Sequence, residues 1–300
     1  MNRLASQPAV LLIVLAVIWS AVFGLVKVIV ETVPPLTAAT LRLMLAGAVL
    51  YAVMRWRGER IEATPGQWGL LTAVGLSGNA IPFVLINWGE LVIDSGLTAI
   101  LIGTVPLFTM VLAHLFGRGE RLTPAKSVGI AVGLAGIVIL MGPELLGGLG
   151  VHVVAELGIV VAALSYAVSN VLASRLTGLP VLAITTATTL IAGFVSVPFS
   201  LVFEAPWTIE PSWRALGAIA AIGLISTALG NLLFFRIVAL AGATFFSLCN
   251  YIVPVLSVVW GMLFLAEALS WRAVTALVFI LGGVAATNAA LRRGAAAAKT

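Results

Sequence analysis

Ten long apolar stretches follow one another along this chain with only short connections between them. They cover roughly residues 9–30, 36–54, 67–88, 91–117, 125–142, 154–174, 181–203, 213–235, 239–266 and 271–290. Each can cross a bilayer, whose core of about 30 Å needs about 20 helical residues. Barrel strands would alternate apolar and polar residues, whereas these runs are continuous. The sequence therefore predicts an all-α membrane protein of ten transmembrane helices in contact with the lipid bilayer.

The positive charges fall mainly on one side of this topology. If the N-terminus is inside, only four of the 16 Lys and Arg residues lie on the outer side, namely Lys27, Arg42, Arg214 and Arg272. Basic loops remain in the cytoplasm, so we expect both termini to be cytoplasmic in a bacterial inner membrane. The basic residues are spread over separate loops, so the net charge of +5 indicates topology and does not indicate a nucleic-acid partner.

The sequence shows no recognisable catalytic apparatus. The one cysteine, Cys249, and the two well-separated histidines, His114 and His152, do not form a metal-binding pattern. Phosphate-binding loops, zinc-protease motifs and nucleophile elbows are also missing. We therefore expect neither an enzyme nor a metal or other cofactor.

The second half of the chain repeats the first. Pro106 aligns with Pro254 at an offset of 148 residues, and Glu120 aligns with Glu267 at 147. This predicts two units, residues 1–150 and 151–300, of five helices each. Because five is odd, the two copies lie in opposite orientations, which is an inverted repeat. Such halves favour transport by alternating access, with the substrate between them; a channel or a rigid scaffold that does not transport remains the alternative.

Residues in both halves resemble a known family. In the first half these are Trp19, Phe23, Lys27, Pro35, Arg42, Ala99, Pro106, Phe108, Thr109, Glu120, Arg121, Gly129 and Gly136. In the second half they are Tyr166, Asn170, Pro254, Glu267, Gly282 and Gly283. They match the EamA-type repeat of the drug/metabolite transporter superfamily, although Ser20 and Val22 depart from the usual residues. The overall look is similar to the YddG-like exporters of aromatic amino acids. The resemblance implies a secondary transporter that exports small organic metabolites.

Polar and aromatic side chains recur at helical spacing on faces that lipid would not favour. We expect these to line a substrate cavity: Trp19, Phe23, Asn79, Phe83, Thr98, Tyr166, Asn170, Asn231, Phe246, Asn250, Ser257 and Trp260. A buried Asn must be paired or must face water. Each Asn could equally act as a hydrogen bond between helices.

Two further groups of residues suggest moving parts. Pro106 and Pro254 each remove a backbone hydrogen bond inside a membrane helix, which predicts a hinge or, alternatively, a static kink. Four charged residues near one leaflet, Lys27, Arg42, Glu90 and Asp94, predict ion pairs that close an outer gate, unless they pair only locally at the interface. The spacing of Gly129, Gly133 and Gly136 predicts close helix packing, either within the chain or between two copies.

The positions of the acidic residues limit the classes of substrate that the sequence favours. Asp and Glu are absent from the middle of every predicted helix, so neither a partner for a cationic drug nor a central proton-carrying carboxylate is apparent. Aromatic or other hydrophobic amino acids are therefore the leading small-molecule substrates. Other metabolites or hydrophobic drugs are the alternative.

We predict that the loop at 55–62 and the C-terminus are cytoplasmic. Single cysteines at Arg57→Cys and Ala297→Cys, in a Cys249-free background, should not react with an impermeant thiol reagent added outside intact cells. Labelling of either site from outside would contradict the topology.

Overall fold

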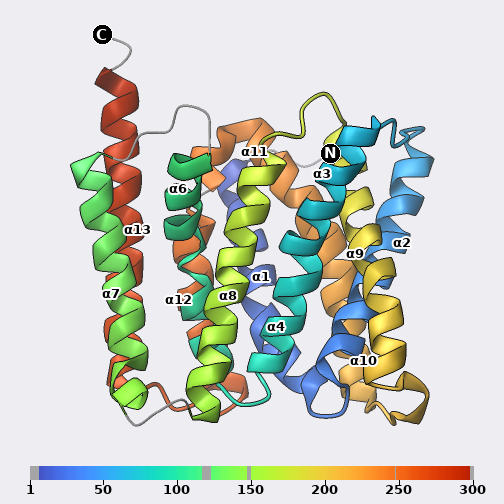
Figure 1. Ribbon diagram of the computed structural model, residues 1–300, viewed down its shortest axis with the longest axis horizontal. Helices are drawn as coiled ribbons and strands as arrows, with labels where there is room; N and C mark the ends of the chain where they lie inside the picture. Colours follow the sequence, from blue (N-terminus) through green and yellow to red (C-terminus); the bar gives the residue numbers. More distant parts are fainter. Residues whose placement is uncertain (1–6, 117–122, 147–149, 247, 298–300) are drawn as a thin grey trace.

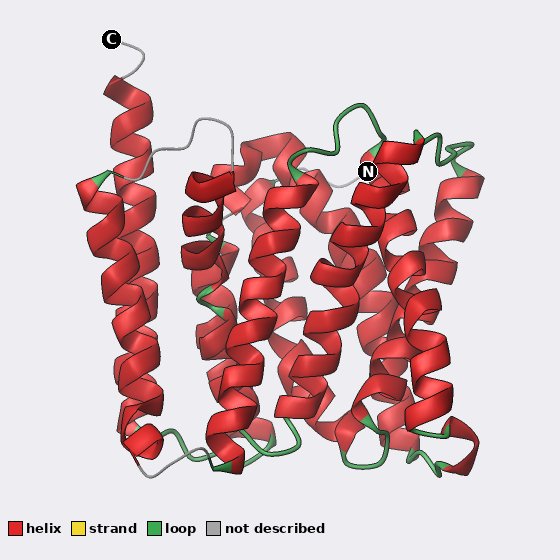
Figure 2. Ribbon diagram, viewed as in Figure 1, coloured by secondary structure: helices red, strands yellow, loops and turns green. Residues whose placement is uncertain are grey.

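The computed structural model describes residues 7–116, 123–146, 150–246 and 248–297, and every regular element in these ranges is a helix (Figures 1 and 2). Nine helical stretches there are long and apolar enough to cross a membrane, and a further apolar helix, α12 (Cys249–Phe264), is shorter. The predicted all-α class is thus confirmed for the described ranges. The loop around Glu120 and Arg121 lies outside them.

Most of these ten apolar stretches, which we call crossings, are single helices. These are α1 (Pro8–Val30), α2 (Pro35–Trp56), α7 (Pro124–Leu146), α8 (Val151–Ala173), α9 (Val181–Phe203), α12 and α13 (Trp271–Ala297). Three crossings consist of consecutive segments: α3 (Pro65–Gly75), η2 (Leu76–Ala80) and α4 (Ile81–Gly89); α5 (Ser95–Ile102) and α6 (Val105–Phe116); and α10 (Trp213–Ala221), η4 (Ile222–Leu229) and α11 (Gly230–Phe246). A short 3-10 turn, η3 (Pro206–Thr208), lies between α9 and α10.

Both η2 and η4 are π-helical, and each lies in the third crossing of its half of the chain. Pro82 explains the first, because it has no N–H and its ring obstructs the preceding turn. The N–H of Ile81 accordingly bonds to the carbonyl of Leu76, five residues back. In η4 the N–H of Gly230 reaches the carbonyl of Ile225 in the same way. Such wide turns occur often at functional sites.

Glycines allow α7 and α13 to pack closely along their length at one edge of the bundle (Figure 1). A Cβ added at Gly129 would lie 2.8 Å from the carbonyl oxygen of Gly283, and one at Gly136 would lie 2.9 Å from that of Ala276. Both distances are too short for a side chain. The glycine stripe therefore packs within the chain.

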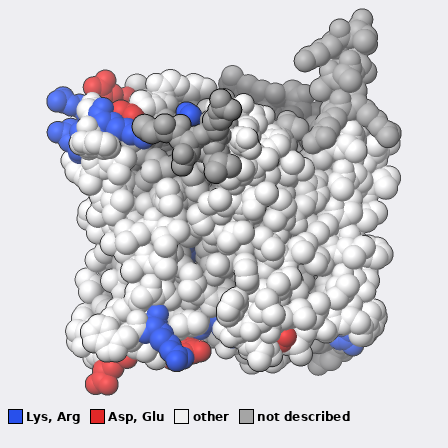
Figure 3. Space-filling model, turned by 180° about the vertical axis from the view of Figure 1, so that it is seen from behind, with Lys and Arg blue, Asp and Glu red and all other residues white. Residues whose placement is uncertain are grey.

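The helix ends form two faces of different charge. The acidic end comprises the connections 31–34, 90–94, 204–212 and 265–270, and the basic end comprises the connections 57–64 and 174–180. Figure 3 shows charged side chains at both ends and a wide, almost wholly uncharged belt between them. This belt matches the hydrocarbon region of a bilayer.

Two neighbouring glycines of α13 give a matched test of this packing. Gly283→Ile should destabilise the protein by about 1–3 kcal/mol, because its side chain would meet the backbone of α7. Gly282→Ile changes the intrinsic helix propensity by the same amount but points into open space, so its destabilising effect should be much smaller. The stability of both variants can be measured by heating the protein in detergent and following the loss of its monodisperse form. Equal stability of the two variants would refute the close contact.

Candidate functional site

Arg42 of α2 lies at the centre of a group that joins helices from both halves of the chain. Its guanidinium carbon is 3.7 Å from the centre of the Phe83 ring, and its Nε donates to Thr227 Oγ1 at 3.1 Å. Tyr166 packs against the same cluster as Phe83 and lies within electrostatic reach of Arg42. Within the described ranges, the two terminal NH2 groups of this half-buried side chain make no hydrogen bond. Arg42 thus presents unused charged donors inside the bundle.

A second group is aromatic and lies where α1 meets α11. Phe234 and Phe246 make an edge-on contact with ring centres 4.5 Å apart, and Trp19 meets Phe246 edge-on at 5.9 Å. The indole N–H of Trp19 donates to the carbonyl of Ser226, in the π-helical η4, at 3.2 Å. Flat rings of this kind suit the apolar body of a small organic molecule.

The predicted amides separate into two kinds. Asn170 of α8 donates to Thr109 Oγ1 at 3.2 Å and so links α8 to α6. Asn79, Asn231 and Asn250 are each partly exposed, and their side chains form no hydrogen bond in the part of the chain that the structure describes. These three amides are therefore available to a ligand or to water.

Four predicted cavity residues are instead buried or hydrogen-bonded within the protein. Ser257 Oγ donates to the carbonyl of Ser20 at 3.0 Å, and the indole of Trp260 donates to Ser20 Oγ at 2.8 Å. Phe23 belongs to the main hydrophobic core. Thr98 is fully buried and bonds back to the carbonyl of Asp94. In this conformation Ser257 and Trp260 hold α12 to α1.

The two predicted hinge prolines lie in membrane-spanning stretches of different form. The fourth crossing is interrupted at Gly103 and Thr104, just before Pro106, where α5 ends and α6 begins. Pro254 lies inside the unbroken α12. A Cβ at Gly103 would lie 3.3 Å from the Pro254 ring, so the interruption in one helix packs against the proline of the other.

Three of the four predicted gate residues gather at the acidic end. The Lys27 ammonium donates to the main-chain carbonyls of Glu90 and Ile93, each at 2.8 Å. Lys27 and Asp94 are also within electrostatic reach of each other. Arg42 does not join them, because its guanidinium packs on Phe83, deeper in the bundle.

Carboxylates from the second half cap helices of the first half at this end. Glu204 accepts hydrogen bonds from the backbone N–H groups of Leu36 and Thr37, at the start of α2. Glu267 accepts from the N–H groups of Ser95 and Gly96, at the start of α5. An anion is favoured at a helix N-terminus, so these bonds fasten the two halves together.

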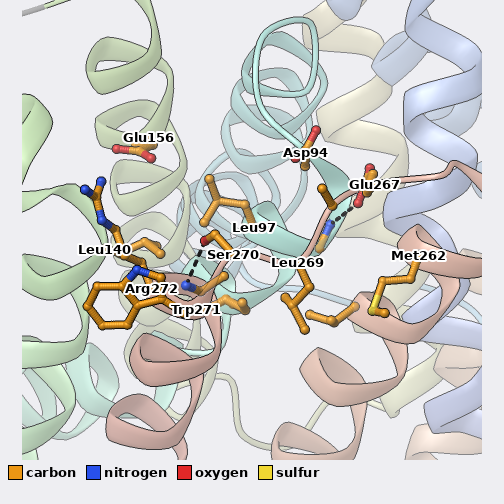
Figure 4. A pocket seen from close by; sticks show the side chains of 15 residues that line it. Asp94, Leu97, Leu140, Glu156, Met262, Glu267, Leu269, Ser270, Trp271 and Arg272 are labelled. Atoms are coloured by element: carbon orange, nitrogen blue, oxygen red, sulfur yellow. Dashed lines mark hydrogen bonds between the residues drawn. The ribbon is translucent and has the colours of Figure 1, made fainter.

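Two pockets lie near the ends of the bundle. One of about 380 Å³ at the acidic end is lined by Asp94, Glu156, Glu267 and Arg272 among others. Figure 4 shows these side chains around it, together with the hydrogen bond that Glu267 accepts from the N–H of Gly96. Another of about 550 Å³ lies at the basic end, between Arg57 and Arg236. Neither is lined by Arg42 or by the predicted cavity residues.

Sequence reasoning missed the part that Phe234 plays. Its place beside Trp19 and Phe246 depends on how α11 packs on α1, which no local spacing reveals. The capping role of Glu204 has no clear sequence signal either, because its partner helix is 167 residues away in the chain. Ser270, by contrast, could be recognised, and its hydroxyl accepts from the N–H of Ala273 at the start of α13.

Known proteins with similar sequences are transporters. An uncharacterized inner membrane transporter of Escherichia coli K12, YedA, is 32% identical over 278 residues, covering 89% of this chain and 87% of that protein. An uncharacterized transporter of Bacillus subtilis, YoaV, is 25% identical over 280 residues, covering 91% and 94%. An S-adenosylmethionine/S-adenosylhomocysteine transporter of Chlamydia trachomatis is 28% identical over 266 residues, covering 84% and 80%.

The fold is also shared with a solved protein. One crystal structure aligns with a TM-score of 0.67 at 21% identity and covers 96% of this chain and 99% of that one. The sequence pattern of the EamA-like transporter family matches residues 7–142 and again residues 153–289. Together these two matches span most of the sequence. The chain is therefore a multi-pass membrane protein that belongs to the EamA-like transporter family.

Proposed function

We propose that this transporter exports aromatic or other hydrophobic amino acids across a bacterial inner membrane by alternating access. The observation that carries the proposal is Arg42, a half-buried cation with unpaired donors beside aromatic rings. Two parallel N–H groups of a guanidinium match the two oxygens of a carboxylate. Phe83 and Tyr166, and the cluster around Trp19, would bind the apolar side chain, and the free amides would bind the ammonium group.

The repeat supports a mechanism of this kind. In our proposal residues 1–150 and 151–300 form two inverted five-helix units, with the basic end facing the cytoplasm. The family pattern occurs once in each unit, and a π-helical segment lies in the third crossing of each. Equivalent contacts also recur, since α8 packs on α4 and α6 while α1 packs on α11 and α12. The Arg42 group joins α2 and α4 of one unit to α8 and η4 of the other, which is where a substrate between two rocking halves would bind.

A second substrate follows from one relative. S-adenosylmethionine and S-adenosylhomocysteine, named for the Chlamydia trachomatis transporter, share an α-amino acid end with the amino acids and add an adenine ring. Arg42 would bind their carboxylate in the same way, and aromatic side chains would stack on the adenine. Counterflow in proteoliposomes with amino acids and these nucleosides as competitors separates the two candidates, because the true substrate exchanges with its own label.

The contribution of Arg42 can be measured with paired substrates. The protein should exchange phenylalanine at least about tenfold faster than phenylalanine amide, since only the acid offers a carboxylate to the guanidinium. Arg42→Ala should remove this preference, and Arg42→Lys should restore it only in part, because an ammonium cannot bond both oxygens in a fixed fork.

Arg55→Ala, at an exposed position of the same helix, is the matched control and should keep the preference. An unchanged preference in Arg42→Ala, at equal amounts of reconstituted protein, would show that the carboxylate binds elsewhere.

A further inference from the structure

Glu90 is the most completely buried charged residue in the described ranges. Its side chain has no exposed surface, and neither carboxyl oxygen has a hydrogen-bond partner there. It directly follows the last residue of α4, so it lies at the negative end of that helix. An ionised carboxylate in such a place loses its hydration without compensation, whereas the neutral acid loses much less.

The charged groups around Glu90 come from several elements. Lys27 of α1 donates to the main-chain carbonyl of Glu90 itself, and Glu267, which follows α12, is within electrostatic reach. Asp94 lies in the same connection, and its own electrostatic neighbours include His152 of α8. Glu156 of α8 and Arg272 of α13 line the nearby pocket. Burial and Glu267 raise the pKa of Glu90, the Lys27 ammonium lowers it, and burial outweighs the others, so the pKa is well above its ordinary value.

We propose that Glu90 is a proton-binding site that is occupied in this conformation, in which hydrogen bonds join the two halves at the acidic end, and that this conformation is the closed state of that end. A protonated Glu90 has no negative charge that would attract the Lys27 ammonium. The ammonium therefore stays on the two carbonyls and holds α1 to the 90–93 connection. An ionised Glu90 would attract this ammonium or draw in water, and either change loosens the closed end.

The connection that carries Glu90 also reaches the solvent. Asp94, four residues further along, is exposed and lines the pocket of about 380 Å³ at the acidic end. In our proposal, closure of the acidic end takes up a proton from the solution at that end, and opening releases it. Because the pKa is raised in the closed state, protonation favours closure below that pKa, and this preference is lost as the pH rises through it.

Infrared spectroscopy of the protein in lipid tests proton binding without reference to any substrate. At neutral pH we expect a carbonyl stretching band from a protonated carboxyl group free of hydrogen bonds. Glu90→Gln should lack this band and should fold, because the neutral amide has nearly the shape of the neutral acid. Glu31→Gln, which changes an exposed acid at the same end, should retain it.

Absence of the band in the unmodified protein, or its persistence in Glu90→Gln, would overturn the proposal. If Glu90→Gln fails to fold, pH titration of the unmodified protein still decides. The band must then disappear with a midpoint above the ordinary pKa of glutamate, and a midpoint within the ordinary range would overturn the proposal.

Transport gives a second readout, which rests on the proposed function. Phenylalanine counterflow should slow as the pH of the solution at this end of the protein falls, by up to about tenfold per pH unit between the raised pKa of Glu90 and the ordinary pKa of glutamate. Glu90→Gln should lose this dependence, and Glu31→Gln should keep it. If no counterflow occurs at any pH, the proposed function fails, while the infrared result still decides on the proton site. An equal pH dependence in Glu90→Gln would contradict a role for Glu90 in closure.

Discussion

Water is scarce inside a bilayer, so each charged or polar group there must find its partner within the protein. This constraint accounts for much of the observed geometry. Lys27 satisfies its ammonium with two main-chain carbonyls, and Glu204 and Glu267 satisfy their carboxylates with the free N–H groups of helix starts. Arg42 and Glu90 are exceptions, because in the described ranges only the Nε of Arg42 has a hydrogen-bond partner and neither carboxyl oxygen of Glu90 has one. In our proposal, the donors of Arg42 that lack a partner bind the carboxylate of the substrate.

The same requirement ties the two halves together at the acidic end. Glu204 joins the end of α9 to the start of α2, and Glu267 joins the segment after α12 to the start of α5. Each bond runs from the second half to the first. Both would have to break if the acidic end opened, and in the mechanism that we propose an incoming proton and the returning carboxylates close it again.

Sequence patterns were sufficient for the helical class, and they failed where contacts are distant. Hydropathy predicts the crossings because each stretch carries its own signal over about 20 residues. The same reasoning groups Arg42 with Lys27 and Glu90 because they approach one leaflet, but Arg42 lies about two turns inside α2 and its long side chain reaches Phe83. The contacts of Phe234 with Trp19 and Phe246 could not be predicted either, because they depend on how α11 packs on α1.

The central claim is tested most directly by two distances between the halves, measured by double electron–electron resonance between spin labels on the protein in lipid. Labels at Leu91 and Glu210 report the acidic end, and labels at Arg57 and Thr177 report the basic end, in a Cys249→Ser background. All four positions are exposed. With phenylalanine present, the acidic-end distance should gain a longer population while the basic-end distance gains a shorter one. If both distributions stayed fixed while the same protein exchanged phenylalanine, the two halves would not alternate.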